Sequence, residues 1–446
     1  MMVGAFGWAV IGTGARVCAF LALSSAPLAA PLTLDAVLAR ADSAHPDLEL
    51  ARAQDEIAQA EAQLAQSLND FRLTLDATLR SGRNQAYNDR FHPDNQVKLN
   101  ARKTLLDFGR RQSATLAADQ EREARGLQLL DARAQRRISL MARYFDVLLA
   151  DMQDAADTEA QAVAYVSWDN AKDRLALGQL AQWELSELEA RYFDAQARRN
   201  DVRRGLREKR MALGAAMNMP GKVGQSAMVL DDLVDPKLPD NERALPEFEE
   251  LLAKVEAANP RLAAQKKLLA AAAQRLSGVR ADNRPSVEFE AEAAAWTRDA
   301  LTRDELRAGF NLLWPIWQGG RTDARLGREQ ARFHELQAQH DKLAMDLSQS
   351  VLALREEIQY LRETARQNAR MNAIYRDQSL DKARAEYEME LKTNLGGSMA
   401  ETQYAQLNRR AIEYRLALAW ARLEALLGGQ QQWASLMSQT KAEDKK

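Results

Sequence analysis

Apolar residues recur along this chain with two different periods, and the changes of period divide it into elements. A helical stretch begins at a threonine N-cap, Thr33, is interrupted by His45-Pro46 and resumes to about residue 68. Over residues 71–80, apolar and polar residues then alternate. A period of two is typical of a strand with one apolar and one polar face, so we expect a half-buried strand here.

A second alternating run follows a segment rich in turn-forming residues, 82–95. It covers residues 97–102, and the two runs together predict a β-hairpin over about 71–104. Lys103 falls on the apolar face, so we expect the second strand to end there. Each run has about the ~9–11 residues that a tilted membrane strand requires.

Beyond this hairpin the pattern is helical over a long distance. No proline occurs between Gly109 and Pro220, and apolar residues recur at steps of three and four to about Ala176. At ~1.5 Å per residue this predicts a helix roughly 100 Å long, which exceeds any compact domain. The pattern breaks at Gly178 and resumes at Glu184 as a return helix.

The same series of elements occurs twice. The first copy covers residues 31–220, a proline-containing linker covers 221–245, and the second copy covers 246–430, with its hairpin at about 286–314 and a polar tail at 431–446. In each copy the second strand runs directly into the long helix through glycine, which adopts backbone conformations that other residues avoid. These strand-to-helix hinges comprise Gly109, Arg110, Pro315, Gly319 and Gly320.

Composition and charge exclude several classes of function. Lys+Arg 61 against Asp+Glu 63 gives a net charge of -2, so no global field favours nucleic acid and we expect no nucleic-acid partner. The only cysteine is Cys18, which rules out disulfides and downstream cysteine ligands or nucleophiles. His334 and His340 fall on different helix faces, which disfavours a shared metal ion. No phosphate loop, nucleophile elbow or HExxH motif is present, so we expect neither an enzyme nor a bound cofactor.

The N-terminus has the features of an export signal. Arg16 precedes an apolar run at 17–23, and small residues follow up to Ala30, so we expect residues 1–30 to be a signal peptide. A membrane anchor that is not cleaved is the alternative. No later stretch approaches the ~20 apolar residues of a spanning helix, so any membrane crossing by the exported protein is expected to use strands.

Four alternating strands cannot close a barrel by themselves. Open sheet edges leave backbone groups unpaired, which hydrocarbon does not tolerate, so membrane strands in this chain require several protomers in one barrel. The alternative is a soluble sheet packed on helices. In a barrel, seven charged residues are expected to face the wet interior: Arg72, Asp76, Arg80, Lys98, Glu288, Glu290 and Arg307.

Five short motifs follow one another in the order found in one family of membrane proteins. Two contain the hinges, Leu105–Arg110 (Leu-Leu-Asp-Phe-Gly-Arg) and Pro315–Arg321 (Pro-Ile-Trp-Gln-Gly-Gly-Arg). The others are Leu32–Leu38 with His45-Pro46, Arg174–Gly178 and Leu423–Gly428. Over almost its full length after the signal segment, the chain therefore resembles the TolC-like outer-membrane efflux proteins, the outer membrane factors.

The resemblance implies a fold, a location and partners. The fold is mainly α with a membrane β portion: long coiled-coil hairpins and four strands per protomer, assembled as a homotrimer into a 12-stranded β-barrel that continues as a periplasmic α-barrel. Such proteins lie in the outer membrane of Gram-negative bacteria, in contact with lipid. They are passive exit ducts of tripartite efflux pumps or type I secretion systems, and they dock with a periplasmic adaptor and an inner-membrane RND or ABC transporter. The alternative function is a soluble periplasmic coiled-coil scaffold or adaptor.

The resemblance also implies sites at the first turn between long helices. Arg174, Leu177 and Gly178 match the tip that adaptors contact. Glu184 lies where related channels carry an acidic residue that lines the closed periplasmic entrance. A solvent-exposed glutamate of the helix surface is the alternative for Glu184.

The second turn departs from the family pattern. Tyr387 and Lys392 match the aromatic and basic residues that help to hold the periplasmic gate closed, but Glu390 stands where a turn glycine is usual. Gly396 and its neighbours replace the acids expected beyond the turn. We therefore do not expect a carboxylate ring from the second copy.

Overall fold

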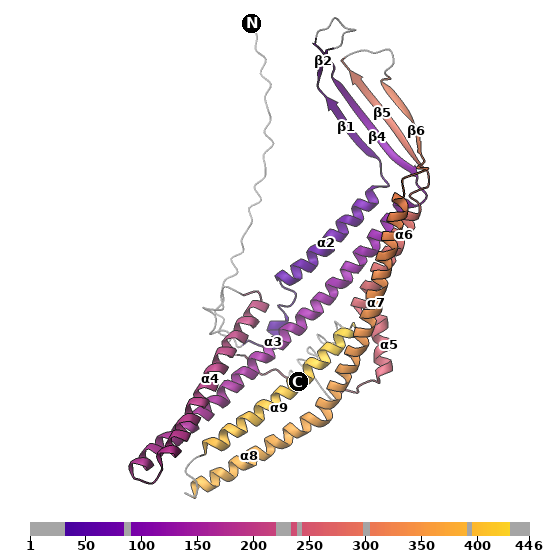
Figure 1. Cartoon of the computed structure of the whole chain (residues 1–446). Coiled ribbons are helices and arrows are strands. Elements are labelled where there is room, and N and C mark those ends of the chain that lie inside the picture. The colour runs from indigo at the N-terminus through magenta and orange to yellow at the C-terminus, as the bar shows by residue number, and fades with distance from the viewer. Residues whose placement is uncertain are drawn as a thin grey trace, which may run out of the picture.

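The computed structural model describes residues 32–83, 91–219, 233–238, 243–297, 304–389 and 395–428. The molecule is elongated, with a β-sheet at one end and two helical hairpins at the other (Figure 1). The predicted signal peptide and the polar tail lie outside the described residues. Within the ranges given above, no helix has the length and apolar character needed to cross a membrane.

Four strands form the main sheet in the order β1-β4-β5-β6, and each neighbouring pair is antiparallel. Their bounds are Arg72–Thr78 for β1, Gln96–Leu106 for β4, Ser286–Trp296 for β5 and Leu306–Leu313 for β6. The central β4–β5 pair joins the hairpin of the first copy to the hairpin of the second. The two copies therefore share one continuous sheet.

The prediction that the second strand ends at Lys103 is wrong. β4 continues to Leu106, with an irregularity between Thr104 and Leu106. The Lys103 ammonium lies 4.7 Å from the centre of the Phe71 ring, a cation–π contact that gives the charge a partner on an otherwise apolar face. A single polar residue that breaks the alternation therefore does not end this strand.

The segment 82–95, predicted to be a turn region, also contains strand. β2 (Ser81–Arg83) pairs with β3 (Phe91–Pro93) in a separate two-stranded sheet. These strands extend the first hairpin beyond the main sheet (Figure 1). The first copy thus has two short strands in addition to the pair that was predicted.

The first copy contributes four helices: α1 (Leu34–Leu38), α2 (Pro46–Ser67), α3 (Arg110–Ala176) and α4 (Gln182–Ala216). The Thr33 hydroxyl accepts a hydrogen bond from the N–H of Ala36 at 3.3 Å and so caps α1, as predicted. The 67 residues of α3 give it a length of ~100 Å. α2 packs along the sheet-side half of α3 and α4 along the opposite half (Figure 1).

The second copy repeats this arrangement, but its first helix is longer than α1 and its long helix contains a π-helical turn. Its helices are α5 (Phe248–Ala258), α6 (Pro260–Arg280), α7 (Arg321–Tyr360), α8 (Arg366–Glu388) and α9 (Gly396–Leu426). A π-helix, η3 (Leu361–Ala365), joins α7 to α8 with right-handed helical backbone on both sides, and α8 runs at an angle to α7 (Figure 1). The sequence pattern did not predict it.

The π-helix accounts for a difference of one residue between the two copies. Val147 of α3 and Ile358 of α7 are both fully buried, and each stands 38 residues after the glycine that precedes its helix, Gly109 or Gly320. Beyond the π-helix, the C-caps Leu177 of α3 and Met389 of α8 stand 68 and 69 residues after those glycines, so the second copy is one residue longer. A π-helix accommodates an extra residue within one turn. The buried faces of α7 and α8 therefore both continue to pack against α9.

Helices of both copies meet the linker in a core near the middle of the molecule. The rings of Phe145 on α3 and Tyr414 on α9 stack with their centres 4.3 Å apart, and Tyr144 is fully buried beside them. The Tyr414 hydroxyl donates to Asp235 at 2.8 Å, and the Tyr144 hydroxyl lies 2.5 Å from the carbonyl oxygen of Val234. Burial raises the pKa of both tyrosines. These contacts fix linker residues 233–238 to α3 and α9.

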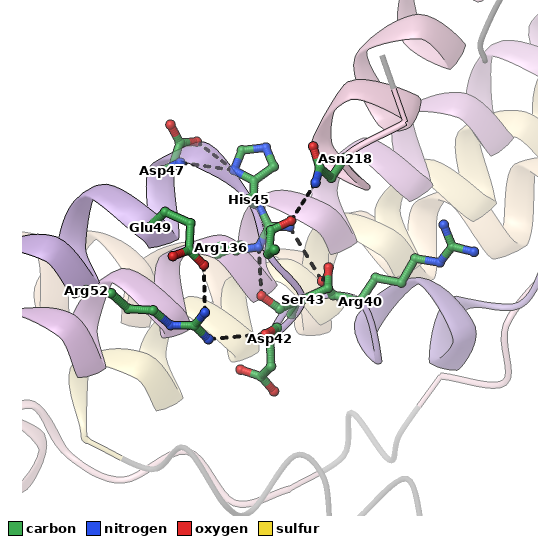
Figure 2. A network of polar contacts seen from close by, with 11 residues as sticks. Arg40, Asp42, Ser43, His45, Asp47, Glu49, Arg52, Arg136 and Asn218 are labelled. Carbon is green, nitrogen blue, oxygen red and sulfur yellow. Dashed lines mark hydrogen bonds and ion pairs between the residues drawn. The ribbon is translucent and has the colours of Figure 1, made fainter. Parts of the chain in front are cut away.

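A buried arginine on α3 contacts two further segments of the first copy (Figure 2). Nε of Arg136 on α3 donates to the carbonyl oxygen of Ala41 at 2.7 Å, and Nη2 donates to that of Ala216 at 3.1 Å. Asn218, just beyond α4, donates to the carbonyl oxygen of Ala44 at 2.7 Å. Burial lowers the pKa of Arg136. The connection between α1 and α2 is therefore held against both α3 and the end of α4.

Candidate functional site

One face of the main sheet is apolar and has no cover in the part of the chain that the structure describes. The register places Leu75, Leu99, Ala293 and Leu306 side by side across all four strands. Leu75 is 68% exposed and Leu306 is 74% exposed. Soluble monomers rarely leave an apolar surface of this extent open to water. This face therefore requires an apolar environment from outside the chain.

The opposite face is polar, and its charged side chains pair across the strands. Glu292 on β5 accepts a hydrogen bond from Arg307 on β6 at 3.0 Å and lies 3.9 Å from Nζ of Lys98 on β4. Arg102 on β4 donates twice to Glu290 on β5, at 3.0 and 2.8 Å. The polar face is thus crossed by ion pairs that connect β4, β5 and β6.

The strands carry most of the predicted lumen residues on this polar face. Six of them share it by register: Arg72, Asp76, Lys98, Glu288, Glu290 and Arg307. Arg80 lies beyond β1 and pairs with Asp94 at 2.7 Å. The prediction omitted Arg102 and Glu292, although both stand at polar positions of the same alternation. Both make cross-strand ion pairs with predicted lumen residues, Arg102 with Glu290 and Glu292 with Arg307 and Lys98.

The main sheet has two open edges. β1 pairs only with β4 and β6 only with β5 among the strands described here. An open edge presents backbone N–H and C=O groups that need partners, above all in an apolar environment. Each edge strand is therefore available to pair with another chain.

The central strands have the length of membrane strands. β4 and β5 each contain 11 residues, which corresponds to ~36 Å at ~3.3 Å per residue. At a tilt of about 40° this gives a height of roughly 28 Å, close to the ~25 Å apolar band of outer-membrane barrels. The apolar face is thus tall enough to match one membrane.

Each long helix begins at a left-handed glycine that follows a strand, with two residues between β4 and the glycine in the first copy and six between β6 and the glycine in the second. Gly109 has φ 88° before α3, and Gly320 has φ 78° before α7. Gly319 also has a positive φ, 61°, whereas Pro315 lies between β6 and α7, outside both. Glycine adopts this conformation without steric cost, which lets the chain turn sharply from strand to helix. Arg110 is the first residue of α3.

A carboxylate that sequence reasoning missed caps the first of these helices. Asp107 accepts hydrogen bonds from the N–H of Gly109 at 3.2 Å, and from the N–H and Nε of Arg111 at 3.0 and 2.8 Å. An acidic group at a helix N-terminus satisfies unpaired N–H groups and interacts favourably with the helix dipole. Asp107 therefore fixes the direction in which α3 leaves the sheet.

Large apolar side chains are exposed near the second hinge. Trp314 is 60%, Ile316 is 87% and Trp317 is 85% exposed. They follow β6 at the end of the sheet nearest the helices (Figure 1). Exposed tryptophans at such a position are typical of a boundary between lipid and water.

The first helical tip is a well-formed turn. Gly178 has φ 71°, its N–H donates to the carbonyl oxygen of Leu175 at 2.9 Å, and the N–H of Gln179 donates to that of Arg174 at 2.8 Å. This pair of bonds is a Schellman motif, which ends a helix at a left-handed residue. Leu177, next to the glycine, is 71% exposed. The three predicted tip residues therefore lie together at the end of α3.

Glu184 has a structural role that the sequence did not indicate. Its carboxylate accepts a hydrogen bond from the N–H of Ala181 at 2.8 Å, at the start of α4. Trp183 beside it is 68% exposed. At the second tip, Tyr387 lies in the last turn of α8 and is 49% exposed, whereas Lys392 falls outside the described residues. Glu184 and Tyr387 thus lie on different helical hairpins, on α4 and α8, and the gate assignment stays a prediction.

A buried polar contact joins the two helical hairpins between the core and the tips. The Tyr404 hydroxyl on α9 donates to the Asp157 carboxylate on α3, which also accepts from Nε2 of Gln153 at 2.9 Å. Asp157 is 5% exposed. Burial, together with the hydrogen bond to Asp157, raises the pKa of Tyr404 to about 12.

The described segments contain no group of three His, Cys, Asp or Glu side chains placed to hold a metal ion. A surface cavity of about 490 Å³ lies between the linker and α9. Both of its carboxylates pair with cations of its own wall, Asp235 with Arg410 at 2.6 Å and Glu413 with Arg366 at 2.7 Å. The cavity is therefore lined by ion pairs rather than by an open set of ligands.

Comparisons with known proteins identify the fold. No protein-family model and no curated protein matches the sequence. Solved structures match over most of the chain. The outer membrane protein VceC from Vibrio cholerae has a TM-score of 0.69 at 21% sequence identity, with 89% of this chain and 96% of that chain covered.

Two further structures agree. The CmeC outer membrane channel of Campylobacter jejuni has a TM-score of 0.72 at 14% identity, covering 91% of this chain and 88% of that chain. The MtrE outer membrane channel of Neisseria gonorrhoeae, solved in its open state, has a TM-score of 0.67 at 17% identity, covering 89% of each chain. This chain therefore has the fold of outer membrane channel proteins, the fold that its resemblance to the TolC-like proteins predicts.

Proposed function

We propose that this protein is an outer-membrane channel of a Gram-negative bacterium, a passive exit duct whose β-barrel is shared by three copies. The observation that carries the proposal is the main sheet, which has one uncovered apolar face, one polar face and two open edges. Lipid covers the apolar face, and water fills the space bounded by the polar face. The fold shared with solved outer membrane channels supports the same function.

The strand directions allow such a barrel to close. The four strands alternate in direction, so β6 of one copy runs antiparallel to β1 of the next. Three copies give 12 strands, an even number within the range of bacterial barrels. Closure pairs both edges of every sheet, which removes the unpaired backbone groups that lipid would penalise.

At the opposite end of the molecule, the tips contact the rest of an export machine. Arg174, Leu177 and Gly178 contact a periplasmic adaptor, and the exposed Leu177 side chain supplies apolar contact area. Glu184, Tyr387 and Lys392 line the closed entrance. Substrate reaches the duct from an inner-membrane transporter of the RND or ABC class, as part of a tripartite efflux pump or a type I secretion system.

Cysteine labelling tests the proposal on the intact protein. In a Cys18→Ser background, Leu75→Cys places a thiol on the apolar face and Thr74→Cys places one on the polar face of the same strand. We expect the protein in the outer-membrane fraction, extracted by detergent as trimers with heat-modifiable migration. Only a lipid-soluble maleimide should label the Leu75→Cys thiol, whereas a membrane-impermeant maleimide should label the Thr74→Cys thiol.

The alternative function predicts a different result. A soluble periplasmic scaffold or adaptor would be released with the periplasmic contents, without detergent. Its Leu75→Cys and Thr74→Cys thiols would both react with the impermeant reagent. That result would overturn the proposal of a duct.

A further inference from the structure

We infer that the polar face of the main sheet presents a cationic surface and favours the passage of anionic solutes, although its charges balance in number. The inference rests on the proposed function, because it treats this face as the wall of the duct. The described strands place four cations and four anions on it: Arg72, Lys98, Arg102 and Arg307 with Asp76, Glu288, Glu290 and Glu292.

In two ion pairs of this face the arginine reaches further into solvent than its carboxylate partner, whereas the Lys98 side chain is 29% exposed and Asp76 is exposed. In the pair of Arg307 and Glu292, the arginine side chain is 61% exposed and the glutamate 8%. In the pair of Arg102 and Glu290, the corresponding values are 59% and 32%. Both guanidinium groups therefore lie on the solvent side of the polar face, and their carboxylates lie between them and the strands.

This layering decides which charge a passing solute meets. The Coulomb energy falls with distance, so a charge about 4 Å away acts on a solute about twice as strongly as an opposite charge about 8 Å away in the same medium. At physiological ionic strength, charges more than ~8 Å away are largely screened. An anion near the wall is therefore attracted by the outer guanidinium groups more than it is repelled by the carboxylates beneath them.

Glu292 positions the cationic layer. It lies between strands β4 and β6 and contacts Arg307 at 3.0 Å and Lys98 at 3.9 Å. Its carboxylate thus compensates two cations from below while remaining almost inaccessible to a solute. We assign Glu292 a positioning role, and Arg102 and Arg307 direct contact with solutes.

The arginine side chains define the class of solute. A guanidinium group binds carboxylate and phosphate groups through two parallel hydrogen bonds, which ammonium groups do not provide. Arg102 and Arg307 each use part of their donor set for a carboxylate on the same face. Their remaining N–H groups are suited to transient contact with carboxylated or phosphorylated organic anions.

A cysteine on the polar face reports this surface charge. Gly309 lies on β6 opposite Glu290, two residues from Arg307, and a Cβ built there meets no atom within 4 Å. In the Cys18→Ser background, Gly309→Cys is treated in assembled trimers with an anionic and a cationic methanethiosulfonate of similar size. Reaction rates are normalised to those of a free small thiol.

We expect the anionic reagent to be favoured at Gly309→Cys by at least about twofold relative to the free thiol. Arg102→Gln with Arg307→Gln should reverse this preference, because the carboxylates then lose their cationic cover. Glu292→Gln should strengthen the preference for the anionic reagent. The charge-conserving Arg307→Lys is the matched control and should leave that preference unchanged. The comparison of the two reagents at Gly309→Cys changes no charged residue, so it does not depend on how the charge variants fold.

Two results overturn the inference, and they are distinguishable. Equal rates for both reagents, or a preference for the cationic one, would refute the cationic surface and leave the duct standing. No reaction with either reagent, in trimers inserted in the membrane, would mean that the polar face is closed to water. That second result would refute the proposed function as well.

Discussion

Replacing Gly178 by valine tests whether backbone conformation alone holds the α3–α4 tip. Gly178 has φ 71°, and a Cβ built at this position meets nothing within 4 Å. The substitution therefore creates no steric clash with a neighbouring segment. Its effect comes from the left-handed backbone, which a β-branched residue adopts only under strain.

The expected magnitude follows from that conformation. A left-handed backbone costs an L-residue about 1–2 kcal/mol, and more when the side chain is β-branched. The Schellman bonds from the N–H groups of Gly178 and Gln179 hold only while the residue stays left-handed. For valine, about 1–2 kcal/mol is therefore the lower bound of the loss, and it makes local opening roughly 5–30 times more frequent. Amide exchange at the tip should accelerate by at least this factor.

Hydrogen–deuterium exchange of peptides that cover residues 173–182 measures this factor in detergent-solubilised protein. Gly205→Val is the matched control, because Gly205 lies inside α4 with nothing within 4 Å of a built Cβ and valine is the better helix former. Gly178→Asn should give an intermediate result, since asparagine tolerates the left-handed region. Equal exchange at the tip in the Gly178→Val and Gly205→Val proteins would refute the reasoning. Under the proposed function, Gly178→Val should also impair export while trimers remain in the membrane.

Three further perturbations test the helical part. Arg136→Met leaves one buried and one partly buried carbonyl group without a donor and should lower the free energy of unfolding in detergent by about 2–4 kcal/mol, whereas Arg137→Met removes an exposed ion pair and should cost less than about 1 kcal/mol. The folded-state pKa of Tyr404 is raised to about 12. The stability that its neutral hydroxyl adds to the folded protein is therefore fully present below pH ~10 and is lost as the pH rises to about 12. The stability difference from Tyr404→Phe, measured by denaturation at successive pH values, should shrink over that interval. Deletion of Glu363 should convert the π-helix to α-helix and leave the thermal stability of the detergent-solubilised protein unchanged, whereas deletion of Gln378 should lower that stability by misaligning α8 on α9.

Sequence periodicity predicts the elements of this fold well because the signals are local. The start of α3 at Arg110 and the break at Gly178 need only a glycine and a change of apolar spacing. The end of β4 was predicted wrongly for a physical reason. A lysine on an apolar face counts as a break in the pattern, yet the Lys103 side chain has an apolar stem and a nearby ring, Phe71, for its charge.

Features that depend on contacts between distant segments could not be predicted in this way. The π-helix adds one residue to a stretch without glycine or proline, so it leaves no local signal. Glu290 and Glu292 look identical in the alternation of β5. Only the register with β4 and β6 shows that Glu292 lies buried between two cations, whereas Glu290 bonds a single arginine. The pairing of β4 with β5 likewise joins segments from different copies of the repeat.

The positions of the two hinges explain why the apolar face needs a cover from outside the chain. Gly109 and Gly320 turn each copy from its last strand into a helix that leads away from the sheet (Figure 1). α2 and α6 likewise end where β1 and β5 begin, so no described helix is left alongside the strands. A soluble α+β protein buries the apolar face of its sheet with helices that fold back over it. Here the same glycines that permit a continuous strand-to-helix path also keep the helices off the sheet, and Leu75, Leu306 and Phe310 remain exposed. The long helices and the bare sheet are thus two consequences of one backbone geometry, and an apolar medium around the strands makes both compatible with a stable protein.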